Sequence, residues 1–235
     1  MKGRLILVGI AISAVSHADV IIDDFTDGAF LLQTPTTAYD TQTGSVPNIV
    51  QGFRMAQAIV GGHPNNRDLL MEVSGGKMFV EAGSGVAGSA TLQWFNSYSG
   101  ASSGAGSPNI SDYVPFAPTL DLSGEKRFRV HYENADQTTT IFIAIYAPDL
   151  LHTRTLALPA APGSGIVEFE FSDFTTGSSS AFANIGMIEM TTAITNGNDI
   201  TYTKFEAVPE PASAFALMSG ATLLVIRKKR RKRVS

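Results

Sequence analysis

The chain contains no cysteine among its 235 residues, which excludes a disulfide framework, a thiolate metal site and a cysteine nucleophile. Histidine is also scarce, with four copies, and His63, His131 and His152 show no metal-ligand spacing. Neither G-x-S-x-G nor H-E-x-x-H occurs. The sequence therefore lacks the common motifs of serine hydrolases and zinc metalloenzymes.

Positive charge is rare in the body of the chain. Residues 19–210 carry eight Lys and Arg against all 21 Asp and Glu, a net charge of −13 with histidine neutral. Such an acidic domain repels nucleic acid and anionic lipid and attracts divalent cations. A body of about 190 residues is long enough for one sizeable core, so we expect a single domain.

The N-terminus has the pattern of an export signal. Lys2 and Arg4 precede an apolar stretch at residues 5–15, and Ala18 closes a group of small residues. This order is typical of a secretory signal peptide with cleavage after Ala18, so residues 1–18 are expected to form a signal helix. The alternative is a short N-terminal helix of a cytosolic fold.

The last 28 residues, 208–235, hold three pieces in a fixed order. A helix-breaking spacer is followed by an apolar run at residues 212–226 and then by a block of cations. The spacer consists of Val208, Pro209, Glu210 and Pro211, and the block of Arg227, Lys228, Lys229, Arg230, Arg231, Lys232 and Arg233. As a helix the apolar run spans roughly 22 Å, short of the ~30 Å hydrocarbon core, which favours a transient transmembrane helix. The cations predict a cytoplasmic tail and place residues 19–207 outside.

This ending resembles the PEP-CTERM sorting signal of Gram-negative surface proteins. The resemblance implies cleavage near Pro211 by an exosortase, a processing enzyme embedded in the inner membrane, and release to or attachment at the cell surface. Signal peptidase and exosortase would then be the processing partners. A nucleic-acid or lipid patch is the alternative for the cations, but a basic block directly after an apolar run is typical of a stop-transfer signal.

The body between the two ends is predicted to be all-β, because no stretch in it shows sustained 3.6-residue periodicity. Strands are expected at residues 20–25, 69–73, 77–82, 91–95, 127–132, 141–147, 153–158, 167–172, 186–191 and 199–207. Residues 29–52 are expected to be a long loop or an irregular edge, and residues 98–112 a surface loop rich in Gly and Ser. Residues 141–147 are apolar on both faces and should be central and covered on both sides. Eight to ten short strands indicate a β-sandwich or jelly roll.

The strand pattern also resembles carbohydrate-binding, galactose-binding-like jelly rolls. The similar segments are Ile22-Asp23-Asp24-Phe25, Arg67-Asp68-Leu69-Leu70, Ile185-Gly186-Met187-Ile188-Glu189 and Ile200-Thr201-Tyr202. The resemblance covers most of residues 19–207 and implies the architecture, without assigning any binding residue.

Clustered carboxylates make a candidate Ca²⁺ site. Asp23, Asp24 and Asp27 lie close together, and Asp199 or Glu206 could join them if the terminal strands are neighbours. Adjacent strand residues point to opposite faces, so Asp23 and Asp24 cannot both be side-chain ligands in a regular strand. Solvated or turn-capping carboxylates are the alternative, and no other cofactor is expected.

Aromatic residues suggest a sugar platform. Trp94, Phe95 and Tyr98 lie beside a Gly/Ser-rich loop, and sugar rings stack on exposed aromatic faces. The alternative is that Trp94 belongs to the core, because Leu92 shares its face of the strand.

One carboxylate pair has a spacing that could serve catalysis. Glu168 and Glu170 share a strand face about 7 Å apart, which would suit a glycosidase. Their alternation with Val167 and Phe169 is more typical of a solvent-facing strand. The sequence therefore predicts a non-catalytic, exported, polysaccharide-associated surface or extracellular-matrix protein. A matrix glycan hydrolase and a structural coat subunit are the alternatives.

Overall fold

The computed structural model describes residues 18–46, 48–62, 67–149, 152–174 and 179–209. One compact unit, Asp19–Pro209, contains all the strands. The predicted signal helix, the apolar run, the cationic block, Glu210 and Pro211 lie outside the described residues. Among the residues that are described, no helix is long and apolar enough to cross a membrane.

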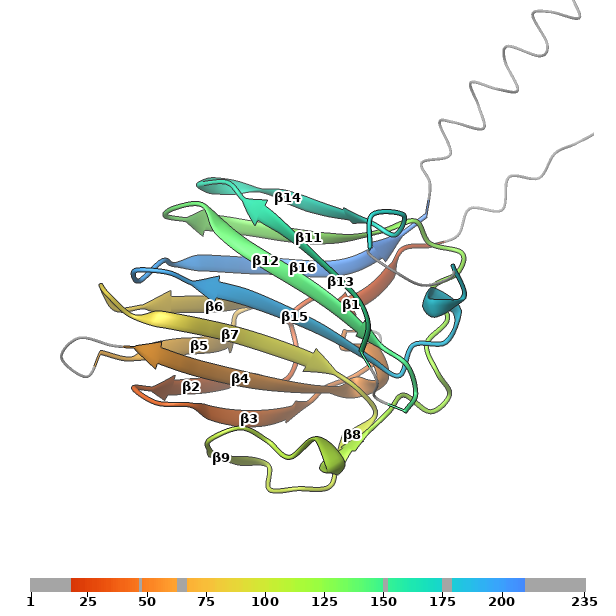
Figure 1. The fold of residues 1–235 in the computed structure, drawn as a ribbon, viewed down its shortest axis with the longest axis horizontal. Coiled ribbons are helices and arrows are strands. Elements are labelled where there is room, and N and C mark those ends of the chain that lie inside the picture. The colour runs from red at the N-terminus through yellow and green to blue at the C-terminus, as the bar shows by residue number, and fades with distance from the viewer. Residues whose placement is uncertain (1–17, 47, 63–66, 150–151, 175–178, 210–235) are drawn as a thin grey trace, which may run out of the picture. The chain divides into compact units, whose positions relative to one another are not determined.

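Two antiparallel sheets of seven strands form the unit, which confirms the prediction of an all-β sandwich (Figure 1). The front sheet faces the viewer in Figure 1. Its order is β13 (His152–Ala160), β12 (Thr139–Tyr146), β15 (Met187–Ile194), β7 (Ala87–Trp94), β4 (Phe53–Gly62), β3 (Ala38–Thr43) and β9 (Ser103–Ala105). The rear sheet runs β14 (Gly163–Glu170), β11 (Arg127–Ala135), β16 (Ile200–Val208), β6 (Lys77–Ala82), β5 (Leu69–Ser74) and β2 (Phe30–Thr34), with β1 (Val20–Asp23) also paired to β16.

The short elements lie outside this pair of sheets. Strands β8 (Ser97–Tyr98) and β10 (Tyr113–Val114) make a separate two-stranded sheet. Three 3₁₀ turns, η1 (Val50–Gly52), η3 (Ile110–Asp112) and η4 (Ser179–Ala183), complete the described elements.

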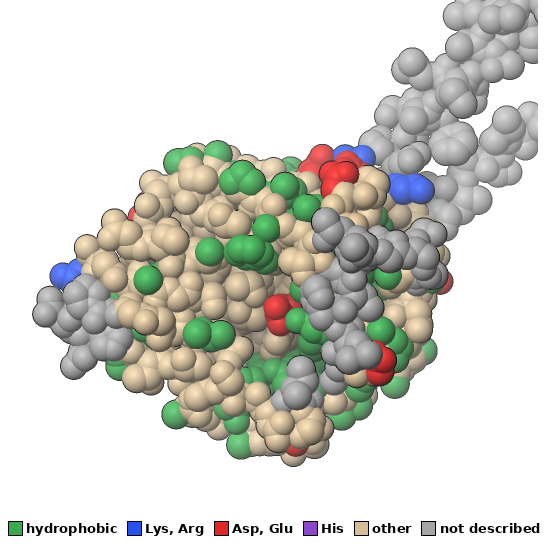
Figure 2. Space-filling view, viewed as in Figure 1, with side chains coloured by type: hydrophobic (Ala, Val, Ile, Leu, Met, Phe, Trp, Pro, Cys, Tyr) green, Lys and Arg blue, Asp and Glu red, His purple; other side chains and the backbone are tan. Residues whose placement is uncertain are grey.

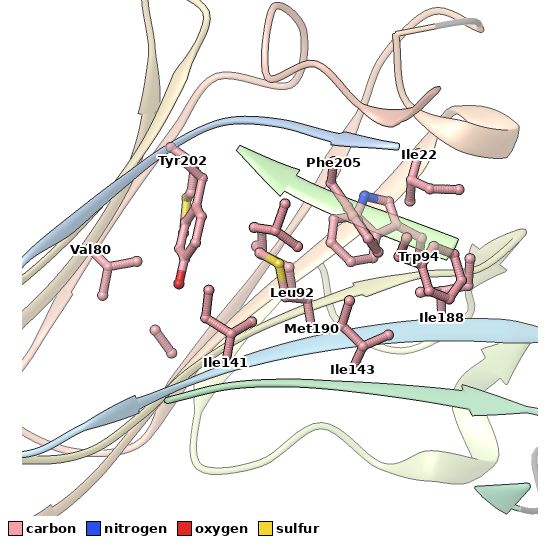
Figure 3. Packing of buried hydrophobic residues seen from close by; sticks show 14 of the residues in the cluster. Ile22, Val80, Leu92, Trp94, Ile141, Ile143, Ile188, Met190, Tyr202 and Phe205 are labelled. Carbon is pink, nitrogen blue, oxygen red and sulfur yellow. The ribbon is translucent and has the colours of Figure 1, made fainter. Parts of the chain in front are cut away.

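The main core fills the space between the two sheets (Figure 3). Alternate residues of each strand point inward, so Leu92 and Trp94 of the front sheet meet Phe205 of the rear sheet. The rings of Trp94 and Phe205 lie 5.2 Å apart between centroids. Each such fully buried large side chain contributes about 1.5–3 kcal/mol to folding, so the core holds the two sheets together.

Strand β12 differs in part from its prediction. It is central, between β13 and β15, as expected. Ile141, Ile143 and Ile145 are buried in the core, but Phe142 on the opposite face is 36% exposed. The second face of this apolar run is therefore not fully covered, which matters for the site described below.

Two polar segments predicted as loop or left unassigned are strands. Residues 29–52, predicted to be a long loop or an irregular edge, contain β3 and also β2, which is an edge strand of the rear sheet, and the ten residues of β4 were not predicted. Pro and Gly are weak strand formers, but cross-strand pairing with β5 and β7 decides the outcome. The predicted hairpin of β5 and β6 is confirmed, as is the turn at residues 196–198, where Asn196 and Gly197 have φ of 56° and 73°.

The two ends of the folded unit lie side by side, because β1 pairs antiparallel with β16 and aligns Val20 with Ala207. Ala18 and Asp19 are exposed directly before β1, where the signal cleavage was predicted. Strand β16 continues to Val208, which is 1% exposed, so the strand extends one residue into the predicted sorting segment.

Candidate functional site

The outer surface of the front sheet, facing away from the core, carries three cross-strand rows of side chains. We name this surface the open face. Its rows are Tyr146 and Met187; then Ala144, Glu189, Gln93, Met55 and Thr41; then Phe142, Thr191, Thr91, Gln57 and Tyr39. From β12 to β3 the rows extend across five strands, roughly 19 Å at ~4.8 Å per strand spacing.

One end of the open face is closed by the segment that holds β8 and β10. Tyr98 and Tyr113 from this segment pack against Phe95 at the end of β7, with ring centroids 6.5 Å and 4.6 Å away. Met55 and Met187 are buried in the same small cluster. Residues 98–112, predicted as a surface loop, thus contain β9 and η3 and contribute a wall to the face.

Figure 2 views the open face directly. The surface is hollowed toward the β8 end, where hydrophobic side chains and an acidic side chain gather. The cationic side chains visible in this view lie at the rim. Small residues such as Ala144, Thr91 and Thr191 form the floor of the rows, while Phe142 and Tyr146 provide rings on β12. A floor of small residues beside raised rings is a shape that can hold a flat ligand.

A chain of hydrogen bonds orients the polar groups of the floor. The Tyr113 hydroxyl donates to Gln93 Oε1 at 2.8 Å, and Gln93 Nε2 donates to Glu189 Oε2 at 2.8 Å. The Tyr146 hydroxyl reaches the same Glu189 oxygen at 3.5 Å. The Glu189 carboxylate is thus held in one orientation by donors from two neighbouring strands, and Tyr113 of the wall orients one of these donors, Gln93.

Tyr113 and Tyr146, the two tyrosines of these hydrogen bonds, stay protonated. Burial raises the pKa of Tyr113, and the nearby Tyr98 and Glu189 raise it further. Burial and the Glu189 carboxylate also raise the pKa of Tyr146. Both hydroxyls therefore remain neutral donors at neutral pH and can orient Glu189 or a ligand oxygen.

Charge distinguishes the two outer faces. In the three rows of the open face, Glu189 is the one Asp, Glu, Lys, Arg or His. The rear sheet instead carries a ladder of ion pairs, in which Arg127 lies 2.9 Å from Glu168 and Arg129 lies 2.7 Å from it. The open face offers hydroxyls, amides and rings, while the rear face satisfies its charges internally.

The carboxylate pair considered for catalysis belongs to that ladder. Glu168 accepts from both arginines, and Glu170 lies 3.0 Å from Arg127. The bond from Arg129, more than the opposing effect of burial, lowers the pKa of Glu168 below its ordinary value. A glycosidase acid needs a raised pKa, so the arrangement matches the solvent-facing alternative.

The predicted aromatic platform is divided between two environments. Trp94 is 0% exposed and points into the main core, which is the alternative interpretation. Phe95 is also 0% exposed, on the opposite side of the strand, under Phe53 and Tyr113. Tyr98 is half-buried in the wall. The structure brings Phe95 and Tyr98 together and separates both from Trp94.

Asp23, the first predicted cation ligand, is paired with an arginine instead. Arg54 Nη1 donates to Asp23 Oδ2 at 2.5 Å, and the indole N–H of Trp94 donates to the same oxygen at 2.8 Å. The amide of Phe25 donates to Oδ1 at 2.8 Å. Burial raises the pKa of Asp23, and the Arg54 guanidinium and these N–H donors oppose the rise.

The other carboxylates proposed for the cation site are dispersed. Asp24 accepts from Thr26 within a local turn, and Asp27 accepts from Ser45 and Asn48. Asp199 accepts from the amide of Ala82, beyond the far end of β16 from Asp23. Within the described part of the chain, no group of three His, Cys, Asp or Glu residues is placed to hold a metal ion.

Glu206, considered as a further ligand, lies on the rear sheet. It pairs with His131 at 2.9 Å and with Lys204. Burial would raise the pKa of Glu206, but the bonds from Lys204 and His131 lower it overall.

Sequence reasoning missed the residues that shape the open face, namely Glu189, Gln93, Tyr113 and Tyr146. The available signal was alternation: once Ile143 and Ile188 are assigned to the core, Ala144 and Glu189 must lie on the opposite face. The pairing of β15 with β7, which places Gln93 beside Glu189, requires the tertiary structure.

Comparison with known proteins identifies no matching family model and no matching curated protein. Among solved structures, the family 11 carbohydrate-binding module of cellulosomal cellulase Lic26A-Cel5E of Clostridium thermocellum is similar at 11% identity and a TM-score of 0.43, covering 82% of this chain and 95% of that one. A family 29 carbohydrate-binding module matches at 15% identity and a TM-score of 0.35, covering 65% and 88%. The agarase AgWH50C matches at 12% identity and a TM-score of 0.40, covering 64% and 23%. At TM-scores below 0.5, these likenesses assign neither a family nor a ligand to this chain.

Proposed function

We propose that this protein is a non-catalytic polysaccharide-binding protein that holds a glycan chain across the open face. The observation that carries the proposal is the lining of that face. It combines the exposed ring of Phe142 and the half-buried ring of Tyr146 on β12 with the half-buried Thr191 and Glu189 on β15, above a floor of buried hydroxyl and amide side chains on β7 and β4.

This lining fits the chemistry of a sugar chain. Sugar rings offer apolar faces for stacking and hydroxyls that both donate and accept, and Phe142 and Tyr146 supply ring surface for the first. Glu189, oriented by the buried Gln93, supplies an acceptor for the second. The wall formed by Tyr98 and Tyr113 stands at the Phe95 end of β7, so a chain would lie beside it, along the rows and across the strands.

The proposal also covers where the protein is located. We infer that residues 1–18 direct export, that residues 208–235 act as a PEP-CTERM-like sorting signal cleaved by an exosortase, and that the body works at the cell surface or in the matrix. Two features support this. The signal-like ends flank a single compact unit, and that unit keeps both termini at one edge.

Affinity gel electrophoresis of residues 19–209 tests the binding role. The gels contain a neutral β-glucan, a galactan, a partly deacetylated chitin or a polyuronate. Ala193→Arg places a bulky side chain on β15, two residues from Thr191 on the same face. Leu31→Arg is the control, because Leu31 is 62% exposed on the outer face of the rear sheet.

We expect retardation by at least one polysaccharide, lost in Ala193→Arg and kept in Leu31→Arg. Migration unaffected by every gel would overturn the binding role. Equal retardation of both variants would show that the ligand binds elsewhere.

A further inference from the structure

Resting on the proposed function, we propose that the polysaccharide bound on the open face carries free amino groups, and that Glu189 binds one of them. The inferred ligand class is thus a glycan containing non-acetylated amino sugars. The argument rests on where the single charge of the face lies and on what surrounds it.

The position of Glu189 is fixed by its neighbours. On the strand pairing, Ala144 and Gln93 flank it, and the small side chain of Ala144 leaves space on the β12 side. Gln93 and Tyr146 both direct their donors to Oε2, and among the described side chains none donates to the other carboxylate oxygen, which faces a ligand in the proposal. The group is therefore a preorganised acceptor beside two rings.

No cation neutralises this carboxylate within the rows. The side chains described there are apolar, hydroxyl, thioether or amide groups. His152 aligns with Tyr146 on the neighbouring strand, but its side chain is not among those described. A half-buried carboxylate whose described partners are uncharged donors gains most from a ligand cation, because a charge-assisted bond is about twice as strong as a neutral one.

The same arrangement disfavours acidic polysaccharides. A uronate or sulfate group brought to the floor of the face would meet Glu189 at short range, within an exported body of net charge −13. The contrast with Glu168 is informative, since that carboxylate already has two arginine partners and offers no vacant charge.

Calorimetric titration of the purified full-length chain tests the inference with three length-matched oligosaccharides: glucosamine, N-acetylglucosamine and glucose oligomers. Glu189→Gln removes the charge and keeps the shape. Glu81→Gln is the matched control, because it removes one carboxylate from an exposed position on the rear sheet. A non-specific attraction to the acidic body would respond to both variants alike.

We expect the glucosamine oligomer to bind most tightly. Glu189→Gln should weaken it roughly 10- to 100-fold, the range for losing a hydrogen bond to a charged group, while Glu81→Gln leaves it unchanged. Binding of all three oligomers with equal affinity, or equal weakening by both variants, overturns the inference and leaves polysaccharide binding intact. Binding of no oligomer here, together with no retardation in any polysaccharide gel, overturns both.

Discussion

Arg54 and Asp23 form a fully buried ion pair, with Nη1 and Oδ2 2.5 Å apart and both side chains at 0% exposure. Arg54 also donates to the carbonyl oxygens of Asp27 and Gly28 and to Gln42 Oε1. The guanidinium therefore gathers oxygens from β1, the following turn and β3. A cationic side chain, Arg54, therefore binds the Asp23 carboxylate that was predicted to be a metal ligand.

Removing this cation should be costly. We predict that Arg54→Met lowers the free energy of unfolding by about 3–5 kcal/mol, because it leaves the Asp23 carboxylate buried and unpaired. Arg129→Met, which breaks a partly exposed pair with Glu168, should cost no more than ~1 kcal/mol. Urea unfolding followed by the fluorescence of Trp94 measures both. Equal costs would contradict this account of the pair.

A glycine in β7 is required by a close backbone approach. A Cβ at Gly88 would lie 1.9 Å from the carbonyl oxygen of Ile59 on β4. We predict that Gly88→Ala destabilises by about 1–3 kcal/mol or more, since the β4–β7 pairing must shift. Gly62, where an added Cβ would have open space, is the control, and Gly62→Ala should change stability by no more than ~0.5 kcal/mol. Comparable thermal midpoints for the two variants would refute the prediction.

The exposed ring on the open face should contribute to ligand binding. We predict that Phe142→Ala weakens polysaccharide binding about 2- to 12-fold, the loss of one aromatic stacking contact. Leu31→Ala, at an apolar position on the rear sheet that is more exposed than Phe142, should not change it. Affinity electrophoresis compares them, and an unchanged retardation of Phe142→Ala would remove this ring from the site.

Acid should destabilise the fold by protonating carboxylates of the rear sheet. The hydrogen bond from Arg129 lowers the pKa of Glu168 below the ordinary 4.5. Burial would raise the pKa of Glu206, but the bonds from Lys204 and His131 outweigh it and lower this pKa below 4.5 as well. A carboxylate with a lowered folded-state pKa stabilises the protein above its unfolded value and loses that effect as pH falls through the folded value. Unfolding free energy should thus be steady between about pH 7 and 5 and fall below about pH 4. In Glu168→Gln the fall should be shallower.

The sequence predicts the sandwich well where alternation is strong. Residues 127–132 and 167–172 have charged residues facing solvent and apolar ones facing the core, and β11 and β14 follow that pattern. The prediction fails in β3 and β4, where Gln42 and Arg54 point inward, because Arg54 is paired with Asp23 from another strand and donates to Gln42. A polar residue buried by a distant partner leaves no periodic signal.

The site was harder to predict than the fold. Trp94 and Phe95 are adjacent in sequence but face opposite sides of one sheet, so a sequence cluster became two environments. Glu189 and Gln93 are far apart in sequence but adjacent in the sheet. Residues of a binding face come together through strand order, which local pattern does not specify.

The most direct test of a polysaccharide on the open face is NMR mapping of amide shifts in residues 19–209 during titration with the oligosaccharide that binds best. The account predicts perturbed amides in β12, β15 and β7, around Ala144, Glu189 and Gln93, with β11 and β14 unchanged. Perturbations confined to the rear sheet, or none at saturating oligosaccharide, would contradict it.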